Sequence, residues 1–210
     1  MNESNTGILV VISAPLGVGK TTLCRALLDR HPEAQLGVSC TSRPPRPREV
    51  DGHDFYFISA EEFRRRARAG DFLEWVNIGG HLFGTPKKPV LDHLQTGRDV
   101  ILNLDVRGAA SVKESYPEAV SVFVFPPTWS ALADRLSKQG TGWDNGPVAE
   151  HLNAARRDAK AADKSDYFVV NEEMVNAAED LSAILRAERR RANHARGDLA
   201  RFLKSPFPTV

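Results

Sequence analysis

The fold of this chain is decided near its start, by the stretch Ile8-Leu9-Val10-Val11-Ile12-Ser13-Ala14-Pro15-Leu16-Gly17-Val18-Gly19-Lys20-Thr21-Thr22. The first five of these residues are apolar and mostly β-branched, which is typical of a strand buried on both faces. A glycine-containing turn follows them, and the apolar spacing of residues 23–28 predicts a helix directly after it. The stretch therefore predicts a buried strand, a turn and a helix N-terminus in immediate succession.

The turn matches the phosphate-binding P-loop pattern G-x-x-x-x-G-K-[ST], with Ala14 at the position of the first glycine. Alanine is tolerated there if its φ angle is negative, because only a left-handed conformation requires glycine. Backbone N–H groups, the helix dipole and the ammonium of Lys20 favour a bound anion, and the Thr21 hydroxyl can bind a Mg²⁺ ion that the phosphates hold. The alternative is a glycine turn with a solvated lysine. The flanking strand and helix favour a nucleoside-triphosphate site at residues 14–22.

Length and composition limit the class of protein. The 210 residues are enough for one α/β domain with insertions or for two small domains, and 41% hydrophobic with 26% charged residues is ordinary for a globular protein. A net charge of +1 argues against nucleic acid or an anionic membrane as a partner. Neither a membrane span nor a signal peptide is evident. Because Cys24 and Cys40 make no disulfide framework, we expect buried thiols in a cytoplasmic enzyme.

Further apolar runs predict more strands of the same sheet, at residues 100–105, 120–125 and 167–170. Helical patterns alternate with them, which favours an α/β fold: a parallel sheet with helices on both faces. Ligands of such sheets bind at the carboxyl ends of the strands, where we expect the P-loop, Asp105 and the end of the last strand to converge.

Between these runs the chain predicts a small mixed insertion. Residues 36–41 and 55–58 are strand candidates, and Ser59 to Glu62 has the spacing of a capping box that opens a helix through Arg68. Another strand is expected at 71–76, followed by a glycine-rich hairpin or turn at 79–84. Thr85 is expected to cap a helix that begins at Pro86 and ends at Gly97.

Residues 41–52 have the most unusual local composition, with arginines held among prolines that fix φ. The segment is either an extended, solvated linker or a guanidinium cluster that binds a phosphate in bidentate fashion. The neighbouring P-loop favours the cluster.

The C-terminal part contains a polar, glycine-containing segment at 137–147, typical of a mobile loop, and helical patterns at 148–162 and 175–190. The basic run at 186–191 is interpreted as a solvated helix end rather than a nucleic-acid patch. Residues 205–210 are expected to be frayed.

Taken together, several separated motifs resemble the guanylate kinase family, which transfers phosphate from ATP to GMP. They occur in order between residues 7 and 190: Ser13-Ala14-Pro15 with Lys20, Thr41-Ser42-Arg43-Pro44-Pro45-Arg46-Pro47, Phe72-Leu73-Glu74-Trp75, Gly84-Thr85-Pro86, Leu104-Asp105-Val106-Arg107-Gly108-Ala109, Pro126-Pro127 and Val169-Val170-Asn171. The resemblance implies a P-loop core (1–37, 91–136 and 161–210), a GMP-binding insertion (38–90) and a lid (137–160).

The resemblance also implies roles for individual residues. The GMP site would be formed by Ser39, Arg43, Arg46, Glu49, Phe55, Glu74, Phe83, Thr85 and Asp105. In it the two arginines bind the phosphate, Glu49 orients them, and the hydroxyls and carboxylates contact guanine. Guanine offers N–H donors, which suit carboxylates, and an acceptor oxygen, which suits a hydroxyl. The ATP site would be formed by residues 14–22 with Arg135 and Asn171; Lys20, Arg43 and Arg135 would be catalytic, and Thr21 would bind Mg²⁺.

Some positions depart from the family pattern. Leu16 stands where the family usually has serine, Phe55 and Phe83 where it has tyrosines, and Asn103 where it commonly has an acid. Two lid arginines are replaced by Gln139 and His151, and the charge could instead come from Lys138, Arg156 or Arg157.

These departures leave three functional hypotheses. The chain is a guanylate kinase acting on GMP and dGMP, a paralogue that has weak activity or takes a different (modified guanine) nucleotide as acceptor, or a non-catalytic binding module. Retention of Lys20 and Thr21 favours an enzyme over the module. A homo-oligomer is compatible with the sequence.

Overall fold

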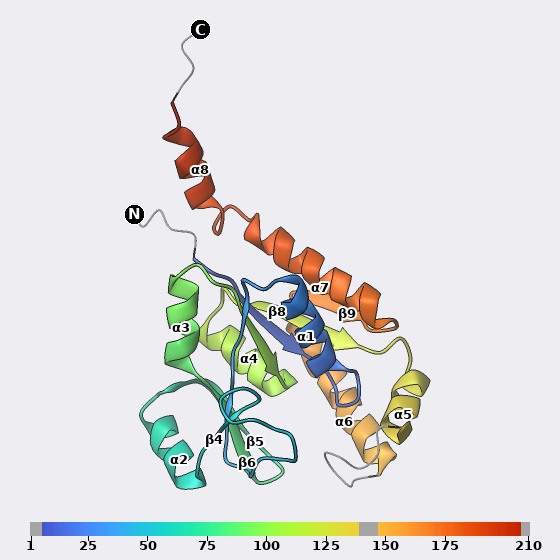
Figure 1. The fold of residues 1–210 in the computed structure, drawn as a ribbon. Coiled ribbons are helices and arrows are strands. Elements are labelled where there is room, and N and C mark those ends of the chain that lie inside the picture. Colours follow the sequence, from blue (N-terminus) through green and yellow to red (C-terminus); the bar gives the residue numbers. More distant parts are fainter. Residues whose placement is uncertain (1–5, 139–146, 207–210) are drawn as a thin grey trace.

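The computed structural model describes residues 6–138 and 147–206, and within them five parallel strands form the central sheet (Figure 1). Their order is β2-β7-β1-β8-β9. The strands are β1 (Leu9–Ser13), β2 (Gln35–Leu36), β7 (Val100–Leu104), β8 (Val120–Phe125) and β9 (Tyr167–Val170). The predicted α/β fold with a parallel sheet is confirmed.

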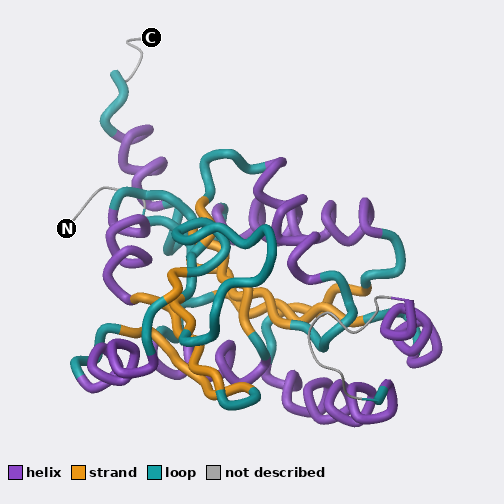
Figure 2. The backbone as a smooth tube through the Cα atoms, turned by 60° about the horizontal axis from the view of Figure 1, so that its bottom comes forward, coloured by secondary structure: helices purple, strands orange, loops and turns teal. Residues whose placement is uncertain are grey.

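Helices cover both faces of this sheet, as Figure 2 shows from below. On one face lie α1 (Lys20–Arg30) and α7 (Met174–Arg189), which pack on Val10 and Ile12 of β1. On the other face lie α3 (Lys87–Gln95) and α4 (Val106–Ser115), which pack on Leu9 and Val11. All of β1 is buried because its alternate side chains enter these two cores. The P-loop therefore starts from the most enclosed strand of the fold.

Three helical elements lie between β8 and β9 in the described ranges. They are α5 (Trp129–Lys138), α6 (Val148–Ala161) and the 3₁₀ helix η1 (Ala162–Lys164). Ala159 of α6 and Ala162 of η1 pack on Val106 and Phe123, beside the carboxyl end of β8. This contact places α6 next to the edge at which the P-loop lies.

A second sheet, in the order β4-β3-β6-β5, lies beside the first. It consists of β3 (Cys40–Thr41), β4 (Tyr56–Phe57), β5 (Phe72–Ile78) and β6 (His81–Pro86), with α2 (Ala60–Arg68). Ser59 accepts a hydrogen bond from the backbone of Glu62, as the capping pattern predicted. Phe63 of α2 stacks on Phe72, so α2 closes a small separate core.

Two element predictions were wrong. Residues 36–41 are not one strand: β2 belongs to the central sheet and β3 to the second sheet. The chain leaves the central sheet at Gly37, where a Cβ would lie only 2.3 Å from Cδ2 of Leu102. Thr85 does not cap a helix, because Thr85 and Pro86 are the end of β6 and the helix begins at Lys87. Pairing with β5 and a buried hydrogen bond to Glu74 hold Thr85 in the strand.

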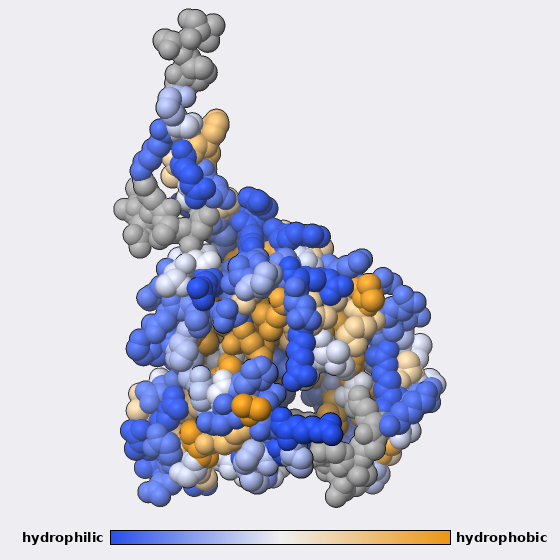
Figure 3. Space-filling model, in the orientation of Figure 1, coloured by the Kyte–Doolittle hydropathy of each residue, from blue (hydrophilic) through white to orange (hydrophobic). Residues whose placement is uncertain are grey.

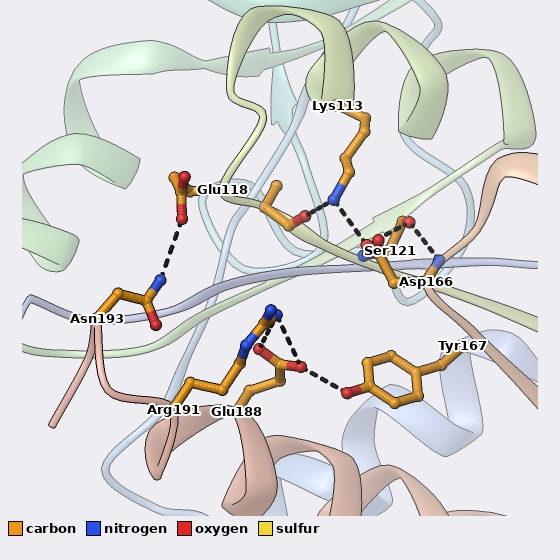
Figure 4. A network of polar contacts seen from close by, with 9 residues as sticks. Lys113, Glu118, Ser121, Asp166, Tyr167, Glu188, Arg191 and Asn193 are labelled. Atoms are coloured by element: carbon orange, nitrogen blue, oxygen red, sulfur yellow. Dashed lines mark hydrogen bonds and ion pairs between the residues drawn. The ribbon is translucent and has the colours of Figure 1, made fainter.

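The end of α7 is fixed to the core by the polar network in Figure 4. The buried carboxylate of Glu188 accepts hydrogen bonds from Tyr167 Oη at 2.5 Å and from Arg191 Nη1 at 3.2 Å. Next to it, Asn193 donates to Glu118 at 3.2 Å. Arg191, the last residue of the basic run that was predicted to be solvated, is thus exposed to solvent and also helps to hold α7 on the core.

An additional helix that the sequence did not predict, α8 (Arg196–Leu203), projects away from both sheets (Figure 1). Leu199, Phe202 and Leu203 are exposed on it, and apolar and hydrophilic atoms gather on different sides of this helix (Figure 3). Both cysteines are buried free thiols, as predicted. None of the helices in the described ranges is long and apolar enough to span a membrane.

Candidate active site

The P-loop, Asp105 and Asn171 gather at the edge of the central sheet where its parallel strands have their carboxyl ends. β1 leads into the P-loop, β7 leads into Asp105, and β9 leads into Asn171. Residues far apart in sequence are thus brought to one edge by the strand order alone.

The P-loop owes its shape to two glycines in the left-handed region, Gly17 at φ +85° and Gly19 at φ +95°. A Cβ on Gly17 would also lie 2.7 Å from Cδ2 of Leu136, so the loop packs closely on α5. Ala14 is buried and has no positive φ, which meets the condition for alanine at this position. α1 then begins at Lys20, and no described side chain caps it, so the first N–H groups can bind phosphate oxygens.

Lys20 extends toward the end of β7, where its ammonium donates to the backbone oxygen of Leu104. Burial lowers the pKa of Lys20, whereas the nearby carboxylates of Asp105 and Asp158 act in the opposite direction. The ammonium is therefore held between the P-loop and two carboxylates, in a position from which it can contact a bound triphosphate.

Thr21 provides oxygen chemistry that fits Mg²⁺. Its exposed hydroxyl accepts a hydrogen bond from Asn103 Nδ2 at 3.2 Å and retains a second lone pair. Within the described ranges no three His, Cys, Asp or Glu side chains are grouped to hold a metal by themselves. A Mg²⁺ ion at Thr21 would therefore draw further ligands from water and from phosphates, as Mg²⁺ does in phosphotransfer sites.

Arg135 and Asn171 connect the P-loop to the segment after β9. Arg135 Nη2 donates to the backbone oxygens of Asn171 at 2.8 Å and Glu172 at 3.2 Å, and Nη1 lies 3.4 Å from the oxygen of Val18. The buried side chain of Asn171 donates to the same Val18 oxygen at 2.7 Å. In this structure both side chains brace the P-loop.

Arg43, Arg46 and Glu49 form a compact cluster in the insertion. Arg43 Nη1 and Nη2 each donate to Glu49 at 2.6 Å, and Glu49 also accepts from the backbone N–H of Arg46 at 2.8 Å. The hydrogen bond from Arg43 is the main reason that the pKa of Glu49 is lowered. A positive φ of +76° at Arg48 closes the turn. The segment is thus a hydrogen-bonded turn rather than an extended linker.

Phe55 and Phe83 lie directly beside this cluster. The Arg43 guanidinium is 5.0 Å from the ring centre of Phe55 and 5.6 Å from that of Phe57. Phe83 meets Phe55 edge-on, with ring centres 5.9 Å apart. Phe55 and Phe57 therefore support Arg43 by cation–π contact, Phe83 packs on Phe55, and none of the three rings brings a hydroxyl to this cluster.

Glu74, Thr85 and Ser39 form a polar chain in the second sheet. Thr85 Oγ1 donates to Glu74 Oε1 at 2.7 Å, and Ser39 Oγ lies 3.5 Å from Thr85 Oγ1. Glu74 Oε2 is buried and has no hydrogen-bond partner among the described residues. Burial raises the pKa of Glu74 to about 7. A buried acceptor without a partner is costly, which suits a position that a ligand's N–H group completes.

Asp105 approaches Glu74 from the central sheet. Its Oδ1 caps α4 by accepting from the backbone N–H of Gly108 at 2.7 Å. A Cβ on Gly108 would lie 3.0 Å from Glu74 Oε2 and 3.1 Å from Asp105 Oδ1. The two carboxylates therefore converge over Gly108, Glu74 from β5 of the second sheet and Asp105 from the end of β7 of the central sheet.

Three residues with a place in this site were not found from the sequence. Gly108 leaves room for both carboxylates, Arg107 donates to Asp105, and Asp158 of α6 lies near enough to Asp105 and Lys20 for their charges to interact. Arg107 and Gly108 stand in the motif around Asp105, which was the available signal. No sequence pattern singles out Asp158.

The lid candidates are only partly described, because Gln139 lies outside the described residues. On α6, Ala155 and Ala159 face the core, and Asp158 is part of the same side. Arg156 and Arg157 instead line a surface hollow together with Asn153 and Lys160. Arg157 is also close enough to Asp158 for their charges to interact, and it stays a candidate for the lid charge.

A family model for guanylate kinase matches residues 6–188. The guanylate kinase of Symbiobacterium thermophilum is 46% identical over 191 residues, which cover 91% of this chain and 90% of that protein. The guanylate kinase of Thermotoga maritima is 41% identical over 196 residues, covering 93% and 94%. A crystal structure of guanylate kinase from Anaplasma phagocytophilum superposes with a TM-score of 0.77 at 28% identity, covering 99% of this chain and 98% of that one.

Proposed function

Because the chain belongs to the guanylate kinase family, we propose that it transfers the γ-phosphoryl group of ATP to GMP, giving ADP and GDP. The observation that supports this most is the approach of two carboxylates, Glu74 and Asp105, to each other at Gly108, with the ammonium of Lys20 close enough to Asp105 for their charges to interact. The carboxylates match the N–H donors of guanine, and the ammonium matches the phosphates of ATP.

In this proposal the P-loop and Lys20 bind the β- and γ-phosphates. Mg²⁺ held at Thr21 would neutralise charge on the same phosphates. Arg135 reaches the phosphates from the base of α5, and Asn171 holds the loop on which adenine lies. Phosphoryl transfer needs positioning and charge stabilisation rather than a protein nucleophile, and these residues provide both.

GMP would bind between the two sheets. Arg43 and Arg46 hold its phosphate, with Glu49 fixing the Arg43 guanidinium and Phe55 and Phe83 beside it. Glu74, Thr85, Ser39 and Asp105 surround the base. Adenine would leave both carboxylates facing an acceptor or an unmatched edge, at about 1–3 kcal/mol for each unsatisfied group. Because these contacts involve only base and phosphate, dGMP is also expected to be an acceptor.

The same assignment divides the chain into working parts. We propose a P-loop core at 1–37, 91–136 and 161–210, a GMP-binding insertion at 38–90, and a lid at 137–160. Substrates of this kind place the reaction in the cytoplasm, with ATP and GMP as the partners and no nucleic acid or membrane. Neither the paralogue hypothesis nor the binding-module hypothesis is favoured by a specific observation.

The test is a coupled assay in which ADP formation from ATP is followed with GMP, dGMP, AMP, CMP and UMP at saturating Mg²⁺. We expect turnover with GMP and dGMP and at least tenfold lower kcat/KM with AMP. Lys20→Ala is the matched inactive variant, expected to remain folded by circular dichroism. Equal turnover with AMP and GMP, or normal activity of Lys20→Ala, would contradict the proposal.

A further inference from the structure

Arg107 is a charged residue at the mouth of the site to which the proposed reaction gives no role. It is the second residue of α4, and its Nε and Nη2 donate to Asp105 Oδ2 at 3.2 Å and 3.1 Å. Its side chain is 63% exposed, whereas that of Asp105 is 30% exposed. An exposed ion pair of this kind is worth little to stability, about 0–1 kcal/mol. The ion pair between Arg107 and Asp105 therefore adds little to the free energy of unfolding, and stability does not explain why an arginine stands at position 107.

The pair has a direct consequence for guanine binding. Each oxygen of Asp105 already accepts hydrogen bonds from another residue, Oδ1 from Gly108 and Oδ2 from Arg107. Beside it, across Gly108, Glu74 has a buried oxygen, Oε2, without a hydrogen-bond partner among the described residues. A guanine that donates to both carboxylates can use Glu74 at once, but at Asp105 it must share or replace the contact with Arg107.

A released Arg107 guanidinium would remain inside a ring of charged groups. Lys20 lies near Asp105, and Asp158 on α6 is close enough for its charge to interact with Arg107, Asp105 and Lys20. Arg107 therefore lies among Asp105, the P-loop lysine Lys20 and Asp158 of α6. The phosphates of both nucleotides must meet in this space if phosphate is to pass between them.

We propose that Arg107 is a further phosphate-binding residue, held on Asp105 in the empty site and transferred to the reacting phosphates when guanine occupies that carboxylate. This inference rests on the proposed function. A guanidinium is suited to the role because its planar donors match phosphate oxygens in bidentate fashion. The guanidinium would also add positive charge beside Asp105, whereas Arg156 and Arg157 of α6 line a hollow on the surface. Recognition of the base would thereby be coupled to the rate of transfer.

The coupling can be tested by comparing GMP with IMP, whose base lacks the exocyclic amine. IMP has one donor fewer for the two carboxylates, so it leaves Arg107 on Asp105. We expect Arg107→Gln to lower kcat with GMP at least tenfold, as the loss of one charged donor does. The same variant should leave kcat with IMP within about threefold of the parent. Its Kd for GMP, measured by calorimetry without ATP, should be unchanged or lower, because a competitor for Asp105 is gone.

Two further variants make the result specific. Arg107→Lys keeps the charge and should recover most of kcat with GMP. Arg98→Gln removes an exposed arginine at the opposite end of β7 and should leave all constants at parent values. Equal loss of kcat with GMP and IMP, or kcat with GMP within twofold of the parent, overturns the inference, as does a tenfold weaker Kd for GMP. If the parent itself does not phosphorylate GMP, the proposed function fails instead.

Discussion

Glu74 is the residue whose ionisation matters most for the proposed acceptor. Its pKa of about 7 is set chiefly by burial, with a smaller contribution from the charge of Asp105. Between the usual value of 4.5 and about 7, the folded chain holds a proton that the unfolded chain has lost. Raising the pH through this window therefore lowers the stability of the empty protein. The same ionisation should strengthen GMP binding, because guanine donors need a carboxylate acceptor.

We therefore expect the Kd for GMP to rise as the pH falls below about 7 in the parent, approaching tenfold per pH unit. The phosphate of GMP titrates as well, with a pKa of about 6, so the control is Glu74→Gln at each pH. That variant should bind GMP more weakly and keep only the phosphate's pH dependence. Calorimetric titration at pH values of about 5.5 to 8.5, a range that includes the pKa values of the phosphate and of Glu74, measures the Kd for GMP of both proteins. Identical pH profiles for the two proteins would show that Glu74 is already ionised or does not contact the base.

Phe83 gives a second prediction for a single residue. Its ring lies beside Phe55 and the Arg43 cluster, and a hydroxyl added there would face a charged phosphate. Phe83→Tyr should lower the KM for GMP by an amount equivalent to about 0.5–3 kcal/mol, with no change in the KM for ATP. Steady-state kinetics with each substrate varied in turn distinguishes the two constants. If the KM for GMP does not fall, the ring edge points away from the phosphate.

Motifs identified residues such as Lys20, Glu74 and Asp105 because the chemistry of phosphate and guanine requires those types. Their hydrogen bonds could not be predicted in the same way. The Glu74–Thr85 pair depends on the register of β5 against β6, and the contact of Asn171 with Val18 joins residues 153 positions apart. Such contacts are decided by tertiary packing, which no local pattern contains.

At the scale of elements, β1, β7 and β8 were predictable because each is a short apolar run that is almost wholly buried, and β9 because it too is a short apolar run, although two of its residues are exposed. The insertion was less predictable because β2, β3 and β4 are only two residues long. Packing of Gly37 on Leu102 decides where the chain changes sheets, and the sequence near Gly37 does not reveal that distant partner. The side of α6 that carries Asp158 follows from helix periodicity only once the packing of Ala155 and Ala159 is known.

The α6 helix carries the next prediction. His151 and Asp158 are two turns apart on one side of it, so an arginine at position 151 would extend from the inward side. His151→Arg, alone or with Gln139→Arg, should raise kcat at least tenfold with little change in either KM, because lid charge acts on the transition state. His81→Arg, on the exposed β5–β6 hairpin, is the control for the same substitution elsewhere. A parent that is already as fast as these variants would mean that its lid charge comes from another residue.

At the scale of the whole molecule, the chain consists of a body that matches the family up to residue 188 and a C-terminal helix beyond it. α8 was not predicted because its eight residues form a short amphipathic pattern without a sheet to pack on. The network of Tyr167, Glu188 and Arg191 ends the body just before this helix (Figure 4). The body and α8 should therefore differ sharply in their importance for the fold.

Ending the chain after Ala192 should leave kcat and both KM values within about twofold of the parent, and should lower the free energy of unfolding by no more than about 1 kcal/mol. The comparison variant is Tyr167→Phe, which removes the hydroxyl donor of the buried Glu188 and should cost about 1–3 kcal/mol. Urea unfolding monitored by circular dichroism measures both. A shortened chain that is less stable than Tyr167→Phe would show that α8 belongs to the body after all.

Direct phosphoryl transfer between the two nucleotides is the central claim, and ³¹P NMR of the reaction mixture tests it most directly. With ATP, GMP, Mg²⁺ and the parent protein, the γ-phosphate signal of ATP should decline while ADP and GDP appear in equal amounts. Inorganic phosphate should stay absent, and omission of GMP should stop the reaction. Release of inorganic phosphate without GDP, or an unchanged spectrum in the presence of folded protein, would contradict the account.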